Sequence, residues 1–149
     1  RKEFNTCHIF ISYSHLDQAY KEELLKHLMP LVRLNKATLW ENTSIDAGEE
    51  WMPEIFKNLE KADIVLCLIS SSFIASDFCY HALEAHTKGS KKVIPIRIKE
   101  VNWDKLDIAK IQGLPSQQWM SDIADSKAWT EVSKGIEAVI DGLKGAGVS

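Results

Sequence analysis

The sequence predicts an α/β fold with a mostly parallel, doubly wound sheet, as one domain over residues 1–149 with its core at about residues 5–144. Two observations predict this class. The run Ile64–Ile69 is apolar at every position, which is typical of a parallel strand covered on both faces. Short runs of this kind alternate with longer segments whose apolar residues recur at helical spacing, and that alternation indicates strand–helix–strand units.

The first third of the chain predicts a strand, a helix and a second strand. The first strand is expected at Thr6–Tyr13. The polar break Ser14–Asp17 can cap a helix over Leu16–Leu34, which has apolar residues on one side and charged residues on the other. Pro30 is expected to kink or end this helix, because proline has no backbone N–H. The second strand is predicted at Ala37–Trp40.

The middle of the chain predicts a loop, two helices and the buried strand. Glu41–Gly48 is rich in turn residues, and acidic residues open the helix expected over Glu49–Lys61. The strand Ile64–Ile69 follows. Beyond its terminal serines we expect a loop and then a helix that begins near Ser76 or Asp77, since either residue can cap a first turn.

The last third predicts a fourth strand and a final helix. The strand is Val93–Ile98, and Pro95 within it indicates an edge position or a bulge. Lys99–Ser121 is expected to be irregular, with a short helix and a short strand. Helical spacing returns over Ser126–Leu143, and the tail Gly145–Ser149 is expected to fray.

Composition and charge exclude several classes of partner. The net charge is -3 and no basic run stands out, so we expect no nucleic-acid partner. No apolar segment approaches the roughly 20 residues that cross a bilayer, and there is no signal peptide, so we expect a cytoplasmic protein with no membrane partner. The chain starts with Arg1 and not Met, and we therefore expect a piece excised from a longer protein.

Cysteine and histidine positions predict neither a disulfide nor a metal site. Cys7, Cys67 and Cys79 are odd in number and far apart, as expected of reduced, buried thiols in a cytosolic protein. His81 and His86 lie five positions apart, on different faces of a helix, unlike the i, i+4 histidine pair of a zinc helix.

Ligands of open α/β sheets bind beyond the carboxyl ends of the strands. The candidate site is therefore expected after the third strand, among Ser70, Phe78, Cys79 and Ala82. The two commonest glycine motifs that cradle phosphates are absent, and no Ser/His/Asp arrangement of a hydrolase stands out. The residues alone thus support an α/β domain with a polar crevice and no particular chemistry.

Three segments in chain order resemble the Toll/interleukin receptor (TIR) domain family. FISYSHLD at Phe10–Asp17 is similar to the family's opening strand and turn. LWENTSIDAGEEW at Leu39–Trp51 is similar to its second strand and BB loop, with Asn42 where bacterial members usually carry Asp. ADIVLCLISSSFIASDFC at Ala62–Cys79 is similar to its third strand and the segment that follows. The resemblance implies a flavodoxin-like sheet of about five parallel strands with helices on both faces.

The resemblance implies two kinds of activity. Many family members hydrolyse NAD⁺ to nicotinamide and ADP-ribose or its cyclic form, whereas others are adaptors that only self-associate. In the enzymes the segment after the third strand reads W-C-x-x-E-L, and its Glu is catalytic. Here the segment from Phe78 to Leu83 reads FCYHAL, so Ala82 stands at the catalytic position.

A carboxylate is needed at that position because positive charge grows on the ribose as the bond to nicotinamide stretches. Ala82 cannot stabilise that charge. Glu84 points roughly 200° away from it on a helix, unless the register of the motif is shifted. His81 is expected to be a surface residue. Ala82 is therefore either an engineered substitution of the Glu or the mark of a naturally inactive member.

The favoured hypothesis is a TIR effector domain, an NAD⁺ glycohydrolase by family, disabled in this chain at Ala82. NAD⁺ is the substrate, and neither a cofactor nor a metal is expected. The resemblance implies activation by self-association through the BB loop, driven by a fused or associated sensor domain outside this chain in antiphage or innate immune signalling. The substrate-binding residues that it implies are Phe10, Ser12, Tyr13, Ile45, Asp46, Ala47, Gly48 and Phe78.

Two alternatives remain. One is a TIR scaffold, an adaptor without enzymatic activity that acts only by TIR–TIR association and carries a native Ala82. The other is an unrelated flavodoxin-like binding or receiver domain. A receiver needs an acidic cluster after its first strand and an Asp at the end of its third. Here those positions are the polar runs Ser12–Ser14 and Ser70–Ser72, which argue against a receiver.

Overall fold

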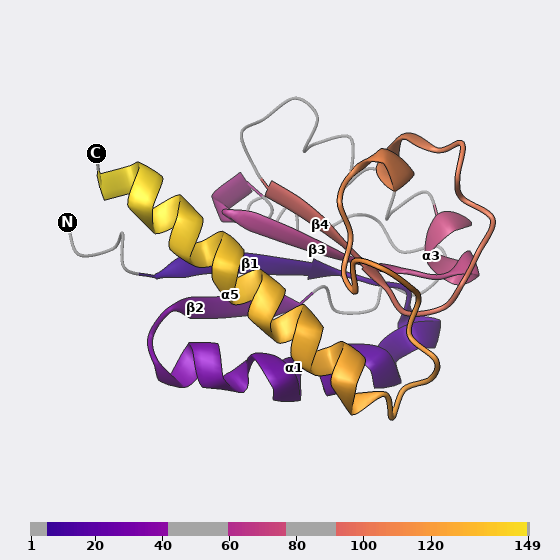
Figure 1. The fold of residues 1–149 in the computed structure, drawn as a ribbon, viewed down its shortest axis with the longest axis horizontal. Coiled ribbons are helices and arrows are strands. Elements are labelled where there is room, and N and C mark those ends of the chain that lie inside the picture. Colours follow the sequence, from indigo (N-terminus) through magenta and orange to yellow (C-terminus); the bar gives the residue numbers. More distant parts are fainter. Residues whose placement is uncertain (1–5, 42–59, 77–91, 149) are drawn as a thin grey trace.

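The structure is a computed structural model that describes residues 6–41, 60–76 and 92–148. Figure 1 shows a twisted sheet with helices packed across it. The elements in chain order are β1 (Cys7–Ser12), η2 (His15–Asp17), α1 (Gln18–Arg33), β2 (Ala37–Glu41), β3 (Ile64–Ile69), α3 (Ser71–Ile74), β4 (Lys92–Arg97), η3 (Asp107–Lys110) and α5 (Ser126–Val148). Of the helix predicted over residues 49–61, only Glu60 and Lys61 are described, and both are helical.

The described strands form one parallel sheet in the order β2–β1–β3–β4, which confirms the predicted fold class. β3, the strand predicted from its unbroken apolar run, is central, and all 6 of its residues are buried. The described sheet has 4 strands and not five. Leu114 makes an isolated parallel bridge with Ile96 of β4, which is the last strand on that side of the described sheet.

Pro95 lies inside β4, at the edge of the described sheet, as its lack of an N–H predicted. Its carbonyl accepts a hydrogen bond from the backbone N–H of Leu114 at 2.9 Å. The irregular stretch predicted after β4 contains the expected short helix, η3, but only this single bridge in place of a short strand.

Side chains alternate between the two faces of the sheet, and each face has its own core. The α1/α5 core holds Ile9 and Ile11 of β1 together with Trp129 of α5. The α3 core holds Phe10 of β1 together with Phe73 of α3 and residues of the η3 segment. Figure 1 shows α5 lying across one face of the sheet with α1 beside it. The predicted helices on both faces are therefore confirmed.

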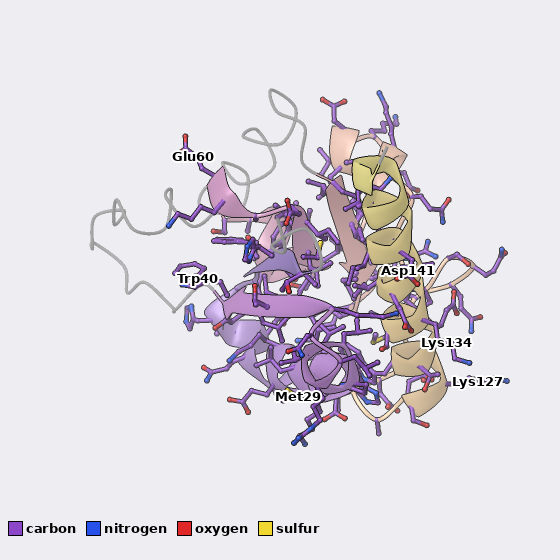
Figure 2. All side chains as sticks on the ribbon, turned by 90° about the vertical axis from the view of Figure 1, so that its left-hand side faces the viewer. Met29, Trp40, Glu60, Lys127, Lys134 and Asp141 are labelled. Carbon is purple, nitrogen blue, oxygen red and sulfur yellow. The ribbon has the colours of Figure 1, made fainter. Side chains whose placement is uncertain are left out.

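Figure 2 separates these two faces. Trp40 of β2 lies on the side of the sheet away from α5, where it packs against the α3 core. Lys127, Lys134 and Asp141 lie along the outer side of α5. α5 thus places an apolar stripe on the sheet and a charged stripe in solvent, which is the amphipathic pattern that its sequence predicted.

The helix predicted over Leu16–Leu34 is η2 followed by α1, which ends at Arg33, and Pro30 lies inside α1 and does not end it. α5 continues through the glycine-containing tail to Val148, so the prediction of an end at Leu143 followed by a frayed tail was wrong. Extending an existing helix by one residue restricts the backbone of that residue alone, so propagation costs less than initiation, and α5 can continue into its tail.

The amino end of α5 is fixed by Asp125. Its carboxylate accepts a hydrogen bond from the backbone N–H of Ala128 at 3.1 Å, the geometry of an N-cap. The same carboxylate accepts from the N–H and hydroxyl of Ser121. These hydrogen bonds lower the pKa of the Asp125 carboxyl, with the Ser121 backbone N–H as the largest cause.

Candidate functional site at the carboxyl edge of the sheet

The strand order reverses between β1 and β3, because the chain leaves β1 for β2 on one side and returns to β3 on the other. Ligands of open α/β sheets bind at the carboxyl edge of such a reversal. Ser12 ends β1 at this edge, and Ser70 directly follows β3. Ser12 and Cys67 are register partners, so the ends of the two strands lie side by side.

A buried carboxylate lies between these strand ends. Asp17 closes the short helix η2 and is 1% exposed. Its Oδ2 accepts a hydrogen bond of 2.5 Å from the hydroxyl of Ser70, and its Oδ1 accepts one of 2.8 Å from Nζ of Lys99. We call Asp17, Ser70 and Lys99 the edge cluster. It joins three segments that are up to 82 positions apart in the sequence.

Local sequence places each member of the edge cluster. The hydroxyl of Ser14 accepts from the N–H of Leu16, which turns the chain after β1 into η2 and brings Asp17 over the strand ends. Ser70 caps α3, because its hydroxyl oxygen accepts from the N–H of Phe73 at 3.1 Å. A short helix therefore begins at Ser71, before the loop and helix that were predicted to follow β3.

Lys99 neutralises the buried carboxylate from the solvent side. It lies just beyond the end of β4, and its side chain is 48% exposed whereas that of Asp17 is 1% exposed. Its ammonium also lies over the ring of Tyr20, at 5.1 Å from the centroid. The hydrogen bond to Asp17 raises the pKa of the Lys99 ammonium, and partial burial opposes this shift.

Ser12 differs from the edge cluster because its hydroxyl lacks a partner. The residue is 0% exposed, and its Oγ is the one buried side-chain oxygen or nitrogen in the described residues that makes no hydrogen bond. An unsatisfied buried hydroxyl is unfavourable, and in native proteins such a group is explained by a bound water or ion, by strain or by a role in a functional site. Ser12 lies two residues after Phe10 on the strand and so faces the same side of the sheet.

The other predicted site residues of β1 and the loop after it lie in packed surroundings. Phe10 is 1% exposed and stacks on Trp40, with ring centroids 5.0 Å apart. It also lines a cleft of about 310 Å³ with Trp40 and Ala62. Tyr13 is 5% exposed and belongs to the α1/α5 core, where the ammonium of Lys21 lies 5.5 Å from its ring centroid.

Part of the predicted site lies outside the described residues: Ile45, Asp46, Ala47, Gly48, Phe78, Cys79 and Ala82. Sequence reasoning identified Ser12 and Ser70 but assigned no role to Asp17 or Lys99. Asp17 stood in a polar break that was assigned to helix capping. Lys99 had no local signal, although its position directly after a predicted strand placed it at the carboxyl edge.

Three further observations limit the kinds of site. Within residues 6–41, 60–76 and 92–148, no three His, Cys, Asp or Glu side chains are arranged to hold a metal ion. None of the helices described is long and apolar enough to cross a membrane. Cys7 and Cys67 are buried thiols, as predicted.

The fold defines a flavodoxin-like domain, a class in which ligands bind at the carboxyl edge where the strand order reverses, and polar residues end β1 and follow β3 at that edge here. Comparison with known families is more specific. A family model described as TIR domain matches residues 9–132. This chain therefore belongs to the TIR domain family, which the sequence motifs had indicated.

One curated protein is similar to most of this chain. The uncharacterized protein y4lF of Sinorhizobium fredii (strain NBRC 101917 / NGR234) is 36% identical over 138 residues, which cover 86% of this chain and 42% of that protein. The chain thus spans less than half the length of this curated relative.

Two solved structures share the fold. The TIR domain of the Toll-related receptor TRR-2 from Hydra magnipapillata has a TM-score of 0.55 and 18% identity, covering 87% of this chain and 97% of that one. The TIR domains of the activated Roq1 resistosome, which directly recognises the pathogen effector XopQ, have a TM-score of 0.55 and 14% identity, covering 87% of this chain and 99% of that one.

Proposed function

We propose that this TIR domain is built to cleave the bond between nicotinamide and ribose in NAD⁺ when copies associate, and that Ala82 disables the present chain. The observation that carries the proposal is the Ser12 hydroxyl, buried and without a hydrogen-bond partner among the described residues, at the strand end where this fold binds ligands. Membership of the TIR family and the FCYHAL segment, which follows β3 in the sequence, supply the chemistry.

The proposed reaction has a dissociative character. The pyridinium of NAD⁺ is already a good leaving group, so stabilisation of the positive charge on the ribose is the main requirement. A carboxylate at position 82 supplies that stabilisation, and Ala82 does not. The Ser12 hydroxyl is proposed to donate to or accept from a ribose hydroxyl or a phosphate. Phe10, Tyr13, Phe78 and the loop residues Ile45, Asp46, Ala47 and Gly48 remain proposed contacts of the substrate.

The proposed partners follow from the family. Association of TIR domains through the BB loop completes the site, and a sensor domain outside this chain drives the association in antiphage or innate immune signalling. The TIR domains of Roq1 were solved within an activated resistosome, so one domain with this fold does work inside an assembly.

The test restores the missing charge. We expect Ala82→Glu, concentrated or crowded to promote association, to release nicotinamide from NAD⁺ at a rate at least about a hundredfold above the chain as it stands, because one well-placed electrostatic group is worth on the order of 10²–10³ in rate. Ala82→Gln is the matched control, since it has the shape of Glu without the charge. Nicotinamide release by Ala82→Gln should stay at the level of the unsubstituted chain. Equal rates in all three proteins, with association demonstrated, would contradict the proposal.

The second candidate function is a scaffold that acts only by TIR–TIR association. Ala82 itself favours it, because a natural alanine at that position leaves no carboxylate for the chemistry. The same experiment separates the two candidates. Assembly without turnover in Ala82→Glu supports the scaffold, and turnover that requires the Glu supports the enzyme.

A further inference from the structure

We infer that the edge cluster is a positioning device: Asp17, held by Lys99, orients the Ser70 hydroxyl and fixes the spacing of the strand ends beside Ser12. The edge cluster is inferred to affect the rate of the proposed NAD⁺ cleavage, so this part of the inference rests on the proposed function. The coupling between the three side chains rests only on their contacts.

The first step concerns the direction of the hydrogen bonds. A serine hydroxyl has one proton and can accept with its lone pairs. Asp17, as a carboxylate, can only accept, so the Ser70 proton lies in the 2.5 Å hydrogen bond to Asp17. The Ser70 oxygen is then directed to accept from the N–H of Phe73 at 3.1 Å. The carboxylate thus determines the rotamer of the hydroxyl that caps α3.

The second step concerns the charge on Asp17. A carboxylate that is 1% exposed needs a cationic or multiple hydrogen-bonding partner to stay ionised at a modest energetic penalty. Lys99 is the cationic partner, at 2.8 Å, and the ring of Tyr20 holds the ammonium from another side. Loss of the Lys99 ammonium removes a hydrogen bond that holds the Asp17 side chain in place. The carboxylate can then move and no longer fixes the direction of the Ser70 hydroxyl towards Phe73.

The third step concerns position. Asp17 follows the end of β1 through a short turn, and Ser70 follows β3 directly, so their hydrogen bond spans the reversal of strand order. Ser12 lies at the same edge and is the register partner of Cys67 on β3. A shift of one strand end against the other therefore moves the Ser12 hydroxyl relative to any group carried by the β3 side. A displacement of about 1 Å can lower a rate on the order of a hundredfold.

The catalytic test uses Ala82→Glu as the parent. We expect Ser70→Ala and Lys99→Met, each added to the parent, to lower kcat about tenfold or more with KM changed by less than about threefold, as a loss of positioning without a loss of binding requires. Lys99→Arg keeps the charge and should retain at least about half of the parental kcat. Ser133→Ala is the matched control, because it also removes a hydroxyl hydrogen bond, to the carbonyl of His27 at 2.8 Å between α1 and α5.

The outcomes are separable from those of the proposed function. If the parent releases nicotinamide but Ser70→Ala and Lys99→Met keep its kcat, the positioning role is wrong and the proposed function stands. If Ser133→Ala lowers kcat as much as Ser70→Ala and Lys99→Met do, the loss follows from removing any interhelical or edge hydrogen bond, and the positioning role is overturned.

A second measurement does not need catalysis. Hydrogen exchange of the Phe73 amide reports its hydrogen bond to Ser70 in the chain as it stands. We expect Lys99→Met to speed this exchange about tenfold, whereas Lys99→Arg leaves it unchanged, because the effect is transmitted through the Asp17 carboxylate. Equal exchange in Lys99→Met and the unsubstituted chain overturns the coupling, whether or not Ala82→Glu cleaves NAD⁺.

Discussion

The α1/α5 side of the sheet and its carboxyl edge are stabilised by different interactions. On the α1/α5 side, Trp129 is fully buried among leucines and isoleucines, and the charged side chains lie on the outer surface. At the carboxyl edge, the buried carboxylate of Asp17 and hydroxyl of Ser70 meet the half-exposed ammonium of Lys99, and the Ser12 hydroxyl has no hydrogen-bond partner among the described residues. The first arrangement supports the fold. The second retains an unfavourable group, which is expected where a protein reserves a position for a ligand.

The largest effect is expected from the apolar side. Trp129 stacks on His27 at 5.7 Å between ring centroids, and its Nε1 donates to the carbonyl of Ile123 at 2.9 Å. We expect Trp129→Ala to lower the free energy of unfolding by about 3–5 kcal/mol, the range for a large buried aromatic residue. Denaturant unfolding followed by circular dichroism measures this change. Lys134→Ala, on the outer side of α5, is the control and should change it by less than about 0.5 kcal/mol. If Trp129→Ala lowered the free energy of unfolding by less than Lys99→Met does, the expected difference between the α1/α5 side and the carboxyl edge would be contradicted.

The next effect compares two lysine ion pairs. Lys99 reaches the buried carboxylate of Asp17, whereas Lys36 reaches Glu137 at 2.7 Å and Asp141 at 3.3 Å, whose side chains are 37% and 54% exposed. We expect Lys99→Met to lower the free energy of unfolding by about 1–3 kcal/mol, because it leaves a buried carboxylate short of a partner. Lys36→Met should lower it by less than Lys99→Met does, because the carboxylates that Lys36 leaves can be hydrated. Denaturant unfolding measures both variants. A larger loss of stability in Lys36→Met than in Lys99→Met would show that burial of the carboxylate does not determine the strength of these ion pairs.

Two glycines of α5 test how closely the helix approaches its neighbours. A Cβ on Gly135 would lie 2.7 Å from a terminal methyl carbon of Leu114, whereas a Cβ on Gly142 meets nothing within 4 Å. We expect Gly142→Ala to raise the free energy of unfolding by up to about 1 kcal/mol, the helix propensity difference. Gly135→Ala should be less stable than Gly142→Ala by at least about 1 kcal/mol because of overpacking. Thermal unfolding of both variants compares them, and equal melting temperatures would exclude a close approach.

The smallest effect is the pH dependence of the N-cap at Asp125. Its folded pKa is lowered, so the stabilisation is present above the unfolded pKa and is lost as the pH falls from about 4 towards the folded pKa. We expect Asp125→Asn, which can still cap, to be less sensitive to acid over that range. Unfolding midpoints measured between pH 7 and about pH 3 test this expectation. Parallel pH profiles in the two proteins would contradict it.

The sequence predicted best where one local signal was sufficient. Ile64–Ile69 was identified residue by residue, because a short run that is apolar at every position is typical of a parallel strand covered on both faces. Ser70 was recognised as a polar residue at the end of that strand. The edge cluster could not be predicted, because Asp17 and Lys99 meet only after three strand-to-strand connections have brought distant segments to one edge. The end of α5 was misjudged because glycine content is a weak signal against an established helix.

The direction of β1 has a practical consequence for labelling this protein. β1 begins at Cys7 and runs towards the edge cluster, and Figure 1 shows α5 running back the other way, so that the start of β1 and the end of α5 lie at the opposite end of the sheet. A strand of 6 residues spans about 20 Å. Fluorophores or affinity handles attached ahead of β1 or after α5 are therefore held a full strand length away from Asp17, Ser70 and Ser12. Such labels can report association while leaving the polar end of the sheet accessible.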